Sequence, residues 1–69
     1  MSDHNAKQAI PSLLQAAMYV SPTGTEQAAF GALVNKMEGA GEPSTVIALA
    51  LADAISDGVR AGNWPKVDG

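Results

Sequence analysis

The sequence predicts an all-α protein, a small three-helix bundle that pairs with a second copy by two-fold symmetry. Apolar residues recur at intervals of three and four over three separate stretches, which is the spacing of one helix face. Proline, glycine and hydroxyl residues stand between those stretches, where helices begin and end. No segment alternates apolar and polar residues in the manner of a half-buried strand.

The first helix is expected from about 11 to 20. Pro11 suits the first helical position, because its missing N–H leaves no helical hydrogen bond unmade there. A helix continued back through Pro11 would meet a clash with the carbonyl of Lys7 and kink, although one helical turn could precede it. Residues 1–5 are expected to fray. The apolar stripe of this helix consists of Ile10, Leu13, Leu14, Ala17 and Met18.

The second helix is expected from about 24 to 38. Thr23 and Glu26 have the T-x-x-E spacing of a capping box, in which each side chain accepts a backbone N–H of the other residue. Gly39 and Gly41 suit the left-handed turn that ends a helix. The apolar stripe consists of Phe30, Leu33, Val34 and Met37.

The third helix is expected from about 43 to 61, with Gly62 as its stop. No residue from 46 to 52 is polar, so the apolar surface there is wider than the face that a surface helix normally buries. Polar residues return at Asp53, and the half from 53 to 60 should face water on one side. We expect the first half to form the dimer interface, through Val46, Ile47, Leu49 and Ala50.

The length of 69 residues predicts a single helical domain, with an irregular tail over 63–69. A domain this small buries only about 60% of the surface of its unfolded chain and is marginally stable alone. The chain has no cysteine, so disulfides are excluded as a source of stability. Oligomerisation or unusually good helix packing remains, and two-fold dimers are the commonest oligomers.

Composition argues against several classes of partner. The formal charge of −3 disfavours a nucleic-acid surface and an anionic membrane, since both require clustered positive charge. No stretch reaches the roughly 18 apolar residues that span a bilayer. The first ten residues lack the charged and apolar regions of a secretory signal, so we expect a cytoplasmic protein.

The sequence contains no recognisable catalytic, cofactor or metal site, and we expect a protein that is not an enzyme. Asp53 and Asp57 lie four residues apart on one helix face, as paired catalytic carboxylates can. Arg60 follows Asp57 by three residues, and a solvated face with one weak ion pair explains the group better. The serines have no partner base, because the only histidine, His4, lies in the terminal segment.

These observations favour a non-enzymatic protein-interaction module, a helical adaptor or inhibitor of a partner protein. A phage or mobile-element origin would fit its small size. The candidate partner-binding residues are the three aromatic ones, Trp64, Tyr19 and Phe30. Trp64 is a typical binding anchor, but it could equally cover the open end of the core.

Two other functions remain open. A dimeric DNA-binding regulator would need a basic surface built from Lys7, Lys36, Arg60 and Lys66. The third helix begins with apolar residues, however, and offers no side chain that reads base edges. Removal of Met1 would create the second alternative, an amino-terminal Ser2-Asp3-His4 segment with four nitrogen ligands suited to Cu(II) or Ni(II).

Overall fold

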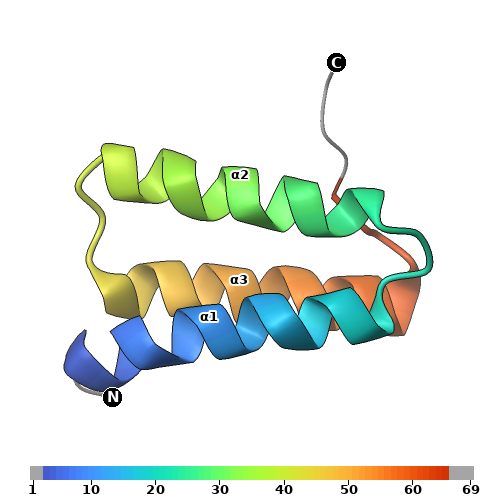
Figure 1. The fold of residues 1–69 in the computed structure, drawn as a ribbon, viewed down its shortest axis with the longest axis horizontal. Helices are drawn as coiled ribbons and strands as arrows, with labels where there is room; N and C mark the ends of the chain where they lie inside the picture. Colours follow the sequence, from blue (N-terminus) through green and yellow to red (C-terminus); the bar gives the residue numbers. More distant parts are fainter. Residues whose placement is uncertain (1–2, 66–69) are drawn as a thin grey trace.

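A computed structural model describes residues 3–65 as three α-helices joined by two short turns. Helix α1 spans Asp3–Val20, α2 spans Thr25–Gly39 and α3 spans Ser44–Ala61. The chain reverses direction at each turn, so α1 and α3 run parallel and α2 runs antiparallel to both (Figure 1). No strand occurs within these residues, and the prediction of an all-α, three-helix arrangement is confirmed.

The helices form a body of 31 × 23 × 17 Å with a radius of gyration of 11.4 Å. A single folded chain of this length is expected to have a radius of gyration near 11 Å. One copy is therefore already packed about as tightly as an ordinary globular domain. No helix in the described part of the chain combines the length and the apolar content needed to cross a membrane.

The start of α1 differs from the expectation, because the helix runs through Pro11 and reaches Asp3. Proline in a helix interior costs about 3 kcal/mol. The compensation lies in the residues before it, since Ala6 and Ile10 are 0% and 8% exposed and belong to the core. Only a continuous helix places these two residues on one face, and Pro11 lies on the exposed side. The expected start at 11 is therefore wrong, and residues 3–5 are helical.

The start of α2 lies within one residue of its predicted position, but its hydrogen bonds differ from a capping box. Gly24 is the residue before the helix and makes no side-chain cap. The Thr23 hydroxyl accepts the backbone N–H of Thr25 at 3.3 Å and donates to Oε2 of Glu26 at 2.7 Å. One half of the predicted capping box is present, because the backbone N–H of Thr23 acts on the Glu26 carboxylate. In place of the other half, the Thr23 hydroxyl accepts the N–H of Thr25 and donates to the Glu26 carboxylate.

Glycines end α2 and α3 close to the predicted positions. The chain leaves α2 through Gly41, whose φ is +80°, and leaves α3 through Gly62, whose φ is +72°. Residues with a side chain rarely adopt this left-handed conformation, whereas glycine adopts it freely. The Gly62 N–H donates to the carbonyl of Gly58 at 2.9 Å and completes the end of α3. Gly41 and Gly62 adopt the predicted left-handed conformation, whereas Gly39 does not, because it is the last helical residue of α2.

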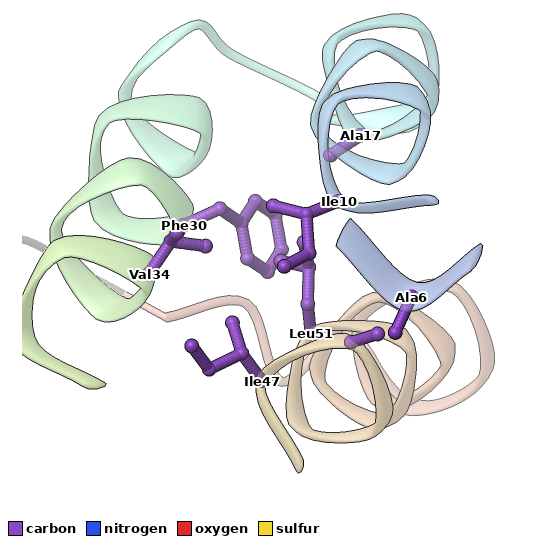
Figure 2. Packing of buried hydrophobic residues seen from close by; sticks show 8 residues of the cluster. Ala6, Ile10, Ala17, Phe30, Val34, Ile47 and Leu51 are labelled. Carbon is purple, nitrogen blue, oxygen red and sulfur yellow. The ribbon is translucent and has the colours of Figure 1, made fainter. Parts of the chain in front are cut away.

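The hydrophobic core lies where the inner faces of the three helices meet. Ile10, Phe30 and Leu51, one from each helix, face one another at its centre (Figure 2). The closest packing is between α1 and α3. Three of the buried core residues on these two helices are alanines, whose small side chains allow two helix backbones to approach closely. The buried cluster consists of Ala6, Ile10, Ala17, Phe30, Val34, Ile47, Ala48 and Leu51.

Candidate functional site

The most distinctive surface feature is apolar and lies on α3. Leu49 is 65% exposed, although its neighbour two residues on, Leu51, is fully buried. A helix turns by about 200° over two residues, so Leu49 lies on the side of α3 opposite the core. Exposed residues at intervals of three and four follow it along the same side. We call this set the outer face of α3: Val46, Leu49, Asp53, Ser56 and Arg60.

The structure divides the four residues predicted for a dimer interface. Val46 and Leu49 lie on the outer face, and Ala50 is half-buried at its edge. Ile47 is only 2% exposed and packs in the core, so its assignment to an interface is wrong. The reason is helical spacing, because Ile47 precedes Leu51 by four residues and shares its inward side.

The three aromatic residues occupy different environments. Phe30 is fully buried, so no partner can reach it while the bundle is closed, and its assignment to a binding surface is wrong. It begins the inward stripe of α2 and meets Ile10 and Leu51 (Figure 2). Tyr19, near the end of α1, is 76% exposed and remains available to a partner. Trp64 is half-buried.

Trp64 folds back onto the core rather than standing free. Its indole meets the ring of Phe30 edge to face, with centroids 6.1 Å apart and ring planes at 78°. The same indole lies against Gly58 of α3, closely enough that a methyl group on Gly58 would overlap it. No buried side-chain nitrogen in the described residues lacks a partner, so the unbonded indole N–H reaches the surface. Trp64 therefore covers the core, one of its two predicted roles.

Exposed apolar residues also gather at the end of α1. Met18 and Val20, on either side of Tyr19, are 53% and 46% exposed. Met18 was expected in the apolar stripe, but it lies eight residues after Ile10, which carries it to the edge of the inward face. A third exposed residue, Val59, is 63% exposed near the end of α3. The ends of α1 and α3 lie at the same end of the bundle (Figure 1).

The charged residues of α3 form a solvated group. Arg60 donates from Nη2 to Oδ1 of Asp57 at 2.8 Å, and both side chains are substantially exposed. An exposed pair of this kind contributes about 0 to 1 kcal/mol. Asp53 lies one turn before Asp57 and is exposed. Within residues 3–65, no three His, Cys, Asp or Glu side chains lie close enough together to hold a metal ion.

The carboxyl group with the most distinct environment belongs to Glu26, which is only 7% exposed. The hydroxyl of Thr23 donates to it and is the largest influence that lowers its pKa below the ordinary value of 4.5. Burial acts in the opposite direction, and the backbone N–H groups of Glu26 and Thr23 lower the pKa further. The arrangement holds a carboxylate at the start of α2, where the helix dipole favours negative charge.

The residues required for DNA binding or for an amino-terminal copper or nickel site lie apart or outside the described residues. Lys7, Lys36 and Arg60 are each exposed on a different helix, and Lys66 lies outside the described residues. His4 is exposed in the first turn of α1, where its Nε2 lies 3.3 Å from Nε2 of Gln8. Ser2, which would provide the terminal amine of a copper or nickel site, also lies outside them.

Sequence reasoning missed the role of Gly58. The sequence pattern alone assigned this glycine no contact. A glycine in a helix interior costs about 1 kcal/mol relative to alanine, so its presence there indicates a close approach by another group. The only tryptophan of the chain follows six residues later. These two signals together could have predicted the contact.

Comparison with known proteins adds no assignment, because no family model, curated protein or solved structure matches the chain.

Proposed function

We propose that this chain is a non-enzymatic protein-interaction module, an adaptor or inhibitor that binds a partner protein through the outer face of α3. The observation that supports this proposal is the exposure of Leu49 next to Val46 on the outward side of a helix whose inward side is fully packed. Complete burial of a leucine or valine side chain contributes about 1.5 to 3 kcal/mol. A partner helix that covers both residues would therefore gain substantial free energy.

The partner we propose is a second copy of the chain. In an antiparallel pair of α3 helices, Val46 of one copy would meet Leu49 of the other, and this contact would repeat on the other side of the two-fold axis. Ala50, beside these residues, is small enough to let the helices approach.

The oligomeric state tests this proposal. We expect the molar mass from light scattering to fall from dimer towards monomer on dilution. The change Leu49→Glu would place a carboxylate at the contact and should yield a monomer. Val59→Glu is the matched control, because Val59 has similar exposure on α3 but lies outside the outer face. This variant should associate as the wild type does.

A wild-type protein that stays monomeric at millimolar concentration would remove the second copy as the partner. The broader proposal of a binding module is tested separately by a photo-reactive amino acid at position 49 or 59 in the native host. Cross-links to a partner protein are expected from position 49 and not from position 59. Equal labelling at the two positions, or none, would contradict a binding role for the outer face.

A further inference from the structure

The segment after α3 closes one end of the bundle. The left-handed conformation of Gly62 turns the chain out of the helix, and residues 62–65 run back towards the start of α2 (Figure 1). This path brings the indole of Trp64 over Gly58 and edge to face against Phe30. The segment therefore covers the end of the core that lies at the carboxyl ends of α1 and α3, where Phe30 would otherwise meet solvent.

Gly58 provides the space that the indole occupies. A Cβ atom at this position would overlap the six-membered ring of Trp64, which is rigid and cannot bend away. Gly31, in α2, offers a contrast, because a Cβ atom there would meet nothing within 4 Å. Both glycines lie inside helices, yet only Gly58 has a steric reason to lack a side chain. The ring and the glycine are complementary in shape.

In the described part of the chain, only packing holds residues 63–65 in place. Within residues 3–65, no hydrogen bond joins Asn63, Trp64 or Pro65 to the helices. The last backbone bond of α3 is made by the N–H of Gly62, before the segment begins its return. Removing Trp64 from Gly58 would therefore break no hydrogen bond of the bundle. Segments held in this way open at lower free energy than the core they cover.

We propose that residues 63–65 form a latch, which opens as a unit while the three helices remain folded and thereby uncovers Phe30 and the Gly58 side of α3. In the closed state Trp64 covers these residues. In the open state an aromatic residue of the core and the indole itself both become accessible. The latch thus controls access to Phe30 and to the covered face of Trp64 itself.

Trp64 is the only tryptophan in the chain, so intrinsic tryptophan fluorescence reports on the latch alone. The decisive variant is Gly58→Ala in the full chain, with Gly31→Ala as the control. Gly58→Ala should displace the indole, shift its emission to longer wavelength and raise its quenching by acrylamide, while the circular dichroism of the helices stays at the wild-type level. Gly31→Ala should leave emission and quenching unchanged.

Two results would overturn the latch. Unchanged emission in Gly58→Ala would show that the indole does not sit on Gly58. Loss of helical circular dichroism together with the emission shift would show that the segment is an inseparable part of the core.

The wild-type protein offers a second test that needs no variant. A urea titration should shift the tryptophan emission at a lower denaturant concentration than the one that removes helical circular dichroism. Transitions followed by different probes coincide when unfolding is two-state, so the separation is direct evidence of independent opening. Coincident transitions would contradict the latch.

Discussion

Helices α1 and α3 are both 18 residues long and pack closely together, but different forces maintain them. α3 has an unbroken run of alanine and leucine, both good helix formers, over residues 48–52, and it has more apolar surface than the bundle covers. α1 contains Pro11 in its interior and would be expected to break there. Its first two turns persist because Ala6 and Ile10 pack into the core. Tertiary packing maintains α1, whereas the sequence of α3 favours the helix by itself.

The buried side chains of the two helices also differ in size. The fully buried residues of α1 are Ala6 and Ala17, whereas α3 contributes Ile47 and Leu51. Small side chains on one helix let the larger side chains of the other reach the centre of the core without a gap. Ile10 is the large exception in α1, because it is buried and faces Phe30 and Leu51 at the centre of the core (Figure 2). At Ala6 and Ala17, α1 contributes only a small side chain to the core.

The largest expected effect comes from removing the proline of α1. Pro11→Ala should stabilise the protein by about 2 to 3 kcal/mol, because alanine restores the helical N–H and relieves the clash with the preceding turn. Pro11 is exposed, so the change loses no core contact. Urea denaturation followed by circular dichroism measures the difference. Ser12→Ala, at the adjacent exposed position, is the control and should change stability by only about 0.5 kcal/mol.

A Pro11→Ala protein no more stable than the Ser12→Ala control would contradict the account of α1. It would mean that Pro11 stands at a helix start, where its missing N–H is harmless. The contrast between α1 and α3 would then be lost, because the local sequence would account for where each helix begins.

An intermediate effect on stability is expected from enlarging Ala17, a buried side chain of α1. Ala17→Leu adds three carbon atoms at a fully buried position and should destabilise the protein by about 1 to 3 kcal/mol through overpacking. Ala16→Leu makes the same chemical change at the neighbouring exposed residue and should stay within about 0.5 kcal/mol of the wild type. Thermal or urea unfolding of the pair gives the difference. Equal effects would show that Ala17 does not determine the spacing of the helices.

The smallest effect is expected at the start of α2, which packs less closely against either of its neighbours. The Thr23 hydroxyl and nearby N–H groups lower the pKa of Glu26 in the folded protein, so the carboxylate form favours folding. This contribution is present above the ordinary pKa of 4.5 and is lost as the pH falls through the lower folded pKa. Melting temperatures measured from neutral to acid pH should show the decline.

Two variants separate this effect from general acid unfolding. Glu26→Gln should flatten the decline, because an amide does not titrate in this range. Thr23→Val should reduce it, since the hydroxyl is the largest of the influences that lower the pKa. A decline that is identical in all three proteins would assign the pH dependence to other carboxyl groups.

The sequence by itself determined the number of helices, the stripes that face inward and the positions of most helix ends. These features depend on contacts within a few residues: the 3.6-residue period, the flanking prolines, and the left-handed glycines at Gly41 and Gly62. Such signals are readable because the physics that produces them is local. They also indicated excess apolar surface at Val46, Ile47, Leu49 and Ala50, but they did not separate the exposed Val46 and Leu49 from the buried Ile47.

Only the tertiary structure decided which signals prevail and which residues remain outside. The free energy gained by burying Ala6 and Ile10 exceeds the cost of Pro11 inside the helix. A sequence pattern does not show how large that gain is. Phe30 and Ile47 lie inside because their helices turn them towards α1, while Leu49 remains outside. Trp64 contacts Gly58 only because the left-handed turn at Gly62 directs the chain back towards the bundle. These outcomes depend on distances between helices, which local spacing does not encode.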